Sequence, residues 1–199
     1  MLRAKAADAE ALLVGPGLGQ ADSTAAFLRG LLAEANSLPP LIFDADALNI
    51  LAKEKQWWNL LPPNCILTPH PGEMARLTGK SSAEVQAARL EMAGRTAVKW
   101  NQIVLLKGAH TVIAAPDGQT MVLPFANPAL AKGGSGDVLA GAIVALRAQG
   151  LGAFEAAVAG GYLHGLAGEL AREQLGATAV VAGDLVGFLP MAIREVTGE

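Results

Sequence analysis

Short apolar runs alternate with longer stretches of helical period along most of the chain. Four of the runs are short and continuous, as buried strands are: Ala11 to Val14, Leu41 to Phe43, Cys65 to Leu67 and Gln102 to Leu106. Strands that alternate with helices predict an α/β fold in three layers, with a mostly parallel central sheet and helices on both faces.

The helical stretches complete this alternation. The predicted helices are Ser23 to Ala35, Leu48 to Lys53, Glu73 to Leu77, Ala83 to Trp100, Asp137 to Gln149, Phe154 to Gln174 and Ala182 to Glu195. Ser23 or Asp22 is expected to cap the first helix. Two further strands, Thr111 to Ala114 and Met121 to Leu123, flank Pro116-Asp117-Gly118, a sequence typical of a hairpin turn.

Loops rich in glycine, proline and polar residues follow the predicted strands. The four loops after the first four strands read GPGLG, DADALN, TPHPGE and KGAHT, and a fifth, GGSGD, precedes a helix. The carboxyl ends of parallel strands share one edge of a sheet, and ligands bind beyond that edge. The sequence therefore predicts a site built from these loops.

The composition limits the classes of function. Of the 199 residues, 52% are hydrophobic and 17% charged, so we expect one globular domain over residues 1–199. The net charge of −3, with no cluster of basic residues, argues against nucleic-acid binding. Val138 to Leu146 is about half as long as a membrane-spanning helix. The lone Cys65 excludes an intrachain disulfide, and we expect a cytoplasmic protein that does not span a membrane.

The segment from Asn127 to Gly141 holds the most specific pattern. Gly133, Gly134 and Gly136 let the backbone approach a ligand closely, and a helix begins directly after them. Its free amides and the positive end of its dipole suit an anion such as a nucleotide phosphate. Asp137 either stabilises this first turn or takes a proton from a substrate as a general base.

Two other loops have both a structural and a functional interpretation. In TPHPGE, the prolines stiffen a turn and Glu73 favours the helix start, or else His70 contacts a polar ligand and Glu73 holds Mg²⁺ through water. In KGAHT, Lys107 extends from a turn into solvent, or else the loop grips an adenine nucleotide. Asp44 and Asp46 are either strand-end residues or ligand contacts, and their spacing does not decide which.

The remaining histidines favour no catalytic role. His164 lies in an apolar helix, where a packing histidine is expected, and His110 is expected to be exposed in its turn. The sequence has no Cys/His cluster and no Gly-x-Ser-x-Gly elbow, so zinc-dependent or serine-dependent hydrolysis has little support.

Six strings, taken in order, resemble the NAD(P)H-hydrate dehydratase family, which also forms the C-terminal half of bifunctional nicotinamide-nucleotide repair enzymes. They are LLVGPGLG, FDADALN, ILTPHPGEMARLTG, VLLKGAHTVIAAPDG, NPALAKGGSGDVLAGAIVALRAQG and YLHGLAGELA, between about Ala11 and Pro190. The resemblance implies a ribokinase-like fold. It also implies removal of water from the S form of hydrated NADH or NADPH, driven by ATP or ADP with Mg²⁺.

The resemblance implies residue roles as well. Asp137 would be the catalytic base or a carboxylate that contacts the substrate, and Gly17 and His70 would bind the hydrated dinucleotide. The nucleotide would be bound by two loops: Lys107, Gly108, Ala109, His110 and Thr111 form the first, and Gly134, Ser135 and Gly136 form an anion hole in the second. The expected order is phosphorylation of the hydrate hydroxyl followed by elimination.

The sequence departs from the family in two ways. It has GGSGD where threonine is usual, but serine keeps the hydroxyl. Family members begin upstream with a segment that supplies initial strands, whereas this chain starts just before GPGLG. We therefore expect a partial domain without its N-terminal strands, with an exposed sheet edge and copies that associate into a homo-oligomer.

Two alternative functions stay open. A ribokinase-like kinase for a small hydroxylated vitamin precursor shares the G-x-G-D pattern, although TPHPGE and DADALN favour the dehydratase. A non-catalytic nucleotide-binding subunit is the second alternative, because the upstream segment supplies part of the substrate pocket in the family.

Overall fold

A six-stranded sheet forms the centre of the computed structural model, which describes residues 8–198. The strands are β1 (Leu12–Val14), β2 (Leu41–Phe43), β3 (Ile66–Leu67), β4 (Ile103–Leu106), β5 (Val112–Ala114) and β6 (Thr120–Val122). They lie in sequence order, with β1 to β4 parallel and β5 and β6 antiparallel. The predicted mostly parallel sheet and the predicted hairpin are both confirmed.

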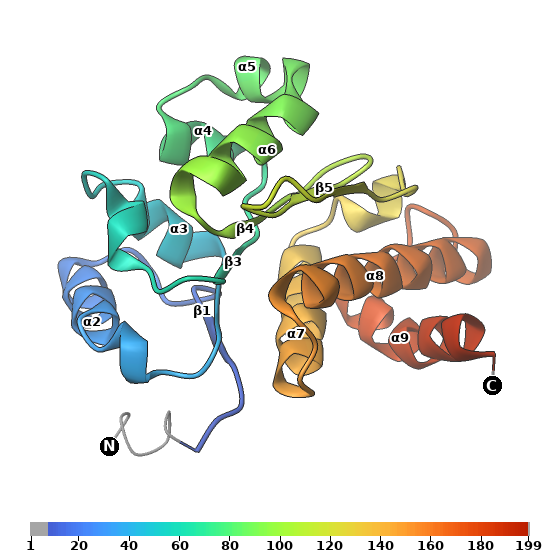
Figure 1. Cartoon of the computed structure of the whole chain (residues 1–199). Coiled ribbons are helices and arrows are strands. Elements are labelled where there is room, and N and C mark those ends of the chain that lie inside the picture. The colour runs from blue at the N-terminus through green and yellow to red at the C-terminus, as the bar shows by residue number, and fades with distance from the viewer. Residues whose placement is uncertain (1–7, 199) are drawn as a thin grey trace.

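Helices cover both faces of the sheet (Figure 1). The α-helices are α2 (Asp22–Leu32), α3 (Ala45–Leu51), α4 (Pro71–Thr78), α5 (Ser82–Ala87), α6 (Arg89–Trp100), α7 (Ser135–Ala148), α8 (Ala153–Leu175) and α9 (Ala182–Thr197), and the 3₁₀ helices are η1 (Ala35–Ser37), η2 (Trp57–Leu60) and η3 (Pro128–Leu130). Helices α2 to α6 lie on one side of the sheet and α7 and α8 on the other, with α9 packed against α8. Among the described helices, none is long and apolar enough to cross a membrane.

The strands supply side chains to two separate cores because successive residues point to opposite faces. Phe43, Leu67 and Val104 are buried in the core beneath α2 to α6. Their neighbours Ile42 and Ile66 are buried in the core beneath α7 and α8. Burial on both faces explains why these strands are continuous apolar runs in the sequence.

The helix predicted from Ala83 to Trp100 is two helices, so that prediction was wrong in its continuity. At Ala88 the backbone leaves the helical region, with φ of −136° and ψ of 42°. Helix α5 begins with a capping box between Ser81 and Glu84 and packs against α4, whereas α6 packs against β4 and β5. The chain changes direction at Ala88 because the two helices cover different elements.

The starts of two other helices also differ from the prediction. The N-cap residue of α2 is Ala21, without a side-chain cap, so neither Ser23 nor Asp22 caps it. Asp22 lies in the first turn instead, where a carboxylate favours the helix dipole. Helix α3 begins at Ala45, directly after β2, and its N-cap residue is Asp44.

The loop after β1 approaches the start of α3 closely. Gly15 has φ of 136°, and a Cβ at this position would overlap the carbonyl oxygen of Asp44. Ala45, on the other side of the contact, has φ of 51°. A glycine is therefore required where the GPGLG loop meets the DADALN loop.

We predict that Gly15→Ala lowers the free energy of unfolding by about 2 kcal/mol or more, because the added Cβ meets backbone and the left-handed φ is strained. The matched control is Gly30→Ala at an exposed position in the last turn of α2, where a Cβ meets nothing within 4 Å. This control should raise the free energy of unfolding by about 0.5–1 kcal/mol. Urea denaturation measures both, and a Gly15→Ala variant as stable as the wild type contradicts the prediction.

Candidate functional site

The predicted loops meet at one edge of the sheet. Strands β1 to β4 are parallel, so the loops that follow them leave from the same edge. The GGSGD loop reaches this edge from the other face: a Cβ built at Gly136 would lie 3.4 Å from Lys107 Nζ and 3.8 Å from Asp44 Oδ2. The start of α7 therefore faces the ends of β2 and β4.

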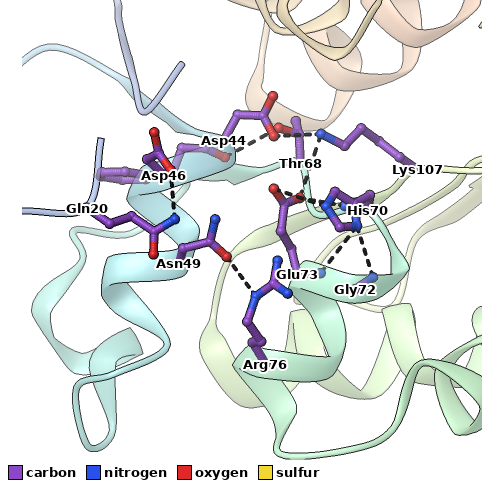
Figure 2. Close-up of polar contacts among 11 residues, drawn as sticks. Gln20, Asp44, Asp46, Asn49, Thr68, His70, Gly72, Glu73, Arg76 and Lys107 are labelled. Atoms are coloured by element: carbon purple, nitrogen blue, oxygen red, sulfur yellow. Dashed lines mark hydrogen bonds and ion pairs between the residues drawn. The ribbon is translucent and has the colours of Figure 1, made fainter. Parts of the chain in front are cut away.

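A buried ion-pair cluster ties three of these loops together. Lys107 Nζ lies 2.7 Å from Asp44 Oδ1 and 3.8 Å from Glu73 Oε2 (Figure 2). The side chains of Asp44 and Glu73 are almost fully buried, and that of Lys107 is only 17% exposed. The alternative in which Lys107 extends into solvent is wrong, because two carboxylates hold its ammonium group inside. Burial raises the pKa of the Glu73 carboxyl, while the charge of Lys107 opposes this shift.

His70 and Glu73 form a capping box at the start of α4. His70 Nδ1 accepts hydrogen bonds from the backbone amides of Gly72 (2.9 Å) and Glu73 (3.3 Å), and Glu73 Oε2 accepts from the backbone amide of His70 (2.8 Å). Nδ1 is therefore unprotonated, and the imidazole proton lies on Nε2. Burial lowers the pKa of His70, and the charges of Lys107 and Arg76 lower it further. A neutral, half-exposed imidazole suits contact with a polar ligand.

Asp46 accepts hydrogen bonds from the end of the GPGLG loop and from the residue that follows it. Its Oδ2 accepts a hydrogen bond from the backbone amide of Gly19 (2.8 Å), and its Oδ1 accepts one from Gln20 Nε2 (2.9 Å). Gly17, the predicted substrate contact in this loop, has φ of 70° and open space around it. The sequence left the roles of Asp44 and Asp46 open, and the structure gives each its own partners.

A cavity of about 330 Å³ lies between the KGAHT turn, the loop after β6 and the helices α7 and α8. A volume of this size is typical of small-molecule sites. Six of the eight predicted nucleotide-binding residues line it: Lys107, Gly108, Ala109, Thr111, Ser135 and Gly136. Leu123, Phe125 and Leu139 supply apolar walls, against which a flat aromatic base can pack.

The other two predicted nucleotide-binding residues do not line this cavity. His110 is exposed in its turn, as predicted, and its backbone amide donates to the carbonyl of Phe125 (2.7 Å). Gly134 is the N-cap residue of α7, with φ of 85°, and a Cβ there would lie 3.1 Å from the Cβ of Ala182. Both residues shape their loops.

The start of α7 has the features of an anion site. No side chain caps the helix, and while the amides of Ser135 and Asp137 donate to the carbonyls of Lys132 (3.2 Å) and Gly134 (3.1 Å), the amide of Gly136 has no acceptor among the described residues. Ser135 and Gly136, in the first turn, line the cavity. Asp137 follows them and is exposed. An anion at the helix start would therefore lie beside the Asp137 carboxylate.

Arg89 is a site residue that the sequence reasoning missed. From the start of α6 its guanidinium donates hydrogen bonds to the backbone carbonyls of Leu106 (3.1 Å), Lys107 (3.2 Å) and His110 (3.4 Å). A Cβ at Gly108 would overlap this guanidinium. Arg89 therefore fixes the shape of the KGAHT turn from behind. The sequence gave no local signal for this role, because Arg89 lay within a predicted continuous helix.

His164 also contributes more than packing. It is buried in α8 and lines the cavity, and its Nε2 lies 3.0 Å from the hydroxyl of Ser135. Burial lowers the pKa of His164 to about 4, so the imidazole is neutral near pH 7. The sequence predicted the burial of this histidine but not its contact with Ser135 at the start of α7.

The fold and the loops at its carboxyl edge define a ribokinase-like α/β protein with a cavity suited to a nucleotide. A solved ribokinase-like superfamily protein from Enterococcus faecalis matches 98% of this chain and 66% of its own, at 27% identity and a TM-score of 0.84. The family model described as NAD(P)H-hydrate dehydratase matches residues 2–190, and the chain belongs to this family.

Two relatives place the chain within the family. A bifunctional NAD(P)H-hydrate repair enzyme from Moorella thermoacetica is 46% identical over 193 residues, which are 97% of this chain and 36% of the relative. The chain thus spans about a third of that relative's length. The ADP/ATP-dependent NAD(P)H-hydrate dehydratase of Bacillus subtilis, co-crystallised with ATP and Mg²⁺, has a TM-score of 0.82 and 37% identity over 96% of this chain and 68% of its own.

We predict that Arg89→Met weakens ADP and ATP binding at least about tenfold, because three carbonyls in and beside the KGAHT turn lose a charged donor and the turn loses its shape. Isothermal titration calorimetry measures the affinity. The matched control is Arg95→Met on the same helix, which removes only an exposed pair with Glu91 and should leave binding unchanged. Wild-type nucleotide affinity in Arg89→Met would show that the turn does not need this arginine.

We predict that His164 makes the fold sensitive to acid. The unfolded chain takes up a proton near the ordinary pKa of 6.5, whereas folded His164 resists protonation down to about pH 4. Its stabilising effect is therefore complete above pH 6.5 and is lost as the pH falls towards 4, at up to about 1.4 kcal/mol per pH unit. His164→Gln keeps a donor near Ser135 but does not titrate. Urea denaturation from pH 7 to pH 5 should show a smaller loss for this variant, and parallel curves would contradict the prediction.

Proposed function

We propose that this chain removes water from the S form of hydrated NADH or NADPH and thereby restores the reduced cofactor, using ATP or ADP with Mg²⁺. The observation that carries this proposal is the meeting of two ligand regions at the start of α7. The nucleotide cavity opens there on one side, and His70 and the GPGLG loop lie across the Asp44–Lys107 pair on the other.

The nucleotide region has the parts that phosphoryl transfer requires. The base and ribose would lie in the cavity, with the phosphates at the start of α7, where the amide of Gly136 has no acceptor among the described residues. Lys107 lies beside Gly136 and supplies a positive charge near those phosphates. Positioning and charge stabilisation supply most of the catalysis in phosphoryl transfer. The co-crystallisation of the Bacillus subtilis relative with ATP and Mg²⁺ supports the same assignment.

The carboxylates of the site fit a magnesium ion that is held mainly by phosphates and water. Within residues 8–198, no group of three His, Cys, Asp or Glu side chains is placed to hold a metal ion. Glu73 already accepts a hydrogen bond at Oε2, which favours contact with Mg²⁺ through water. Asp44 Oδ2 faces the start of α7 and supplies a second hard oxygen. The ion would neutralise charge on the phosphates.

The proposed reaction has two steps, phosphorylation of the hydrate hydroxyl and elimination of phosphate. The Asp137 carboxylate takes the proton of the hydrate hydroxyl while the hydroxyl oxygen attacks the terminal phosphorus of the nucleotide. The bond between that phosphorus and the leaving nucleotide breaks. The carbon–oxygen bond then breaks while the adjacent ring carbon gives a proton to the departing phosphate, so the ring double bond returns, and Asp137 releases its proton to water. Gly17 and His70 hold the substrate during both steps. ATP would yield ADP, and ADP would yield AMP.

An apolar surface supports the expectation that copies of the chain associate. Met121 and Val122 of β6 are exposed at the edge of the sheet, beside exposed Tyr162, Ile193 and Val196 of α8 and α9. Apolar surface of this kind is typical of contacts between proteins. The homo-oligomer and the cytoplasmic location both stay predictions.

We predict that Asp137→Asn lowers the rate of dehydration at least about a hundredfold, because the amide cannot accept the hydroxyl proton. ADP and ATP affinity should stay nearly unchanged. The assay follows the return of reduced-nicotinamide absorbance from hydrated cofactor, with and without nucleotide. Asp117→Asn, an exposed carboxylate in the hairpin turn, is the matched control and should keep wild-type activity.

Three outcomes would contradict the proposed function or the role of Asp137. Wild-type turnover in Asp137→Asn would show that another group takes the proton. Nucleotide-dependent phosphorylation of small alcohols by the wild type, without turnover of the hydrates, would favour the kinase alternative. Nucleotide binding with no turnover of either class would favour a non-catalytic subunit.

A further inference from the structure

A second cleft, polar and separate from the nucleotide cavity, lies beside the His70 region. It has a volume of about 460 Å³ and is lined by Gln20, Asn49, Ala52, Lys53 and Arg76. These residues come from the loop after β1, from α3 and its end, and from α4. Figure 2 shows Gln20, Asn49 and Arg76 on the side of Glu73 away from Lys107.

The Arg76 guanidinium is held in place by an amide and not by a carboxylate. Its Nε donates a hydrogen bond to Asn49 Oδ1 at 2.7 Å. This bond fixes the plane of the group and leaves its two terminal nitrogens for another partner. A Cβ built at Gly72 would lie 3.9 Å from Arg76 Nη1 and 2.8 Å from His70 Cε1, so one end of the guanidinium lies next to His70.

The cations in this cleft make no ion pair with the described carboxylates, although the charge of Arg76 opposes the rise that burial causes in the pKa of Glu73. In the described part of the chain, no carboxylate oxygen lies within 4.0 Å of the charged nitrogens of Arg76 or Lys53. Arg29, by contrast, pairs with Glu54 at 2.9 Å. The nearby Asp46 carboxylate already accepts hydrogen bonds at both oxygens from the GPGLG loop. The cleft therefore presents two cations and amide groups to a ligand.

This set of donors suits a phosphate group. A guanidinium offers two parallel N–H donors that match two phosphate oxygens, and a lysine adds a flexible point charge. Asn49 follows Asp46 at helical spacing on α3, and Lys53 lies just beyond the end of that helix, so both line the cleft together with Gln20, which follows the GPGLG loop. The cleft thus adjoins the region proposed for the substrate, through Gln20 beside the GPGLG loop and Arg76 beside His70.

We propose that this cleft binds a phosphate of the hydrated dinucleotide, with Arg76 as the principal contact and Lys53 as the second cation. The proposal rests on the proposed function, which places the hydrated nicotinamide ring near His70 and Asp137. Two phosphates of the substrate have the required chemistry: the pyrophosphate, which both hydrates carry, and the 2′-phosphate, which only hydrated NADPH carries.

The test measures KM and kcat for hydrated NADH and hydrated NADPH at saturating ATP. Arg76→Met should raise KM at least about tenfold with little change in kcat, because the contact is remote from the reacting atoms. Arg76→Lys should restore part of the loss, and Lys53→Met should show a smaller rise. Lys55→Met, which removes a neighbouring exposed lysine that does not line the cleft, is the control and should match the wild type.

The two substrates distinguish the two sources of the phosphate. Equal rises in KM identify the pyrophosphate, and a rise confined to hydrated NADPH identifies the 2′-phosphate. An unchanged KM for both hydrates in Arg76→Met overturns the proposal, as does a loss of kcat alone. The KM for ATP should not change in any variant.

Turnover measured with the wild-type protein tests the proposed function independently of the proposal for the cleft. Turnover of the hydrates by the wild type upholds that function whatever Arg76 does. If the wild type shows no turnover, calorimetry with hydrated NADPH compares the same variants by binding alone. Weaker binding to Arg76→Met than to Lys55→Met then supports the cleft, and equal binding overturns it.

Discussion

The site depends on one buried interaction, the ammonium of Lys107 held between the carboxylates of Asp44 and Glu73. These three residues follow β4, β2 and β3, so a single cation joins the ends of three adjacent strands. Removing charges from water is costly, and a pair of this kind persists only where its partners are fixed. The two carboxylates would repel each other without Lys107, so the loops that carry them depend on the cation between them.

Further contacts fix the position of each loop that carries one of these three charges. Arg89 holds the turn that carries Lys107, the capping box of His70 and Glu73 fixes the second carboxylate, and the close approach at Gly15 fixes the loop beside Asp44. The opposite side of the sheet contributes α7, whose start reaches the same cation. The backbone contacts and the ion pairs together form a site in which the phosphates of the nucleotide would lie next to the hydroxyl of the hydrated substrate.

Much of this architecture could be predicted from sequence because its signals are local. Continuous apolar runs marked β1 to β4, and the glycine and proline loops after them marked the edge where ligands bind. The interactions that complete the site join distant residues: Lys107 and Asp44 are 63 positions apart, and His164 and Ser135 are 29 apart. Arg89 looked like one more polar residue on a helix. Such partners depend on how the helices cross the sheet, which no local pattern records.

A crystal structure of this chain with ATP and Mg²⁺ tests the central claim most directly. The account predicts that the base lies in the cavity beside Phe125 and that the terminal phosphates lie at the start of α7, at the amide of Gly136, with the Asp137 carboxylate directed at the terminal phosphate. Phosphates bound elsewhere, with Asp137 directed into bulk solvent, would contradict it.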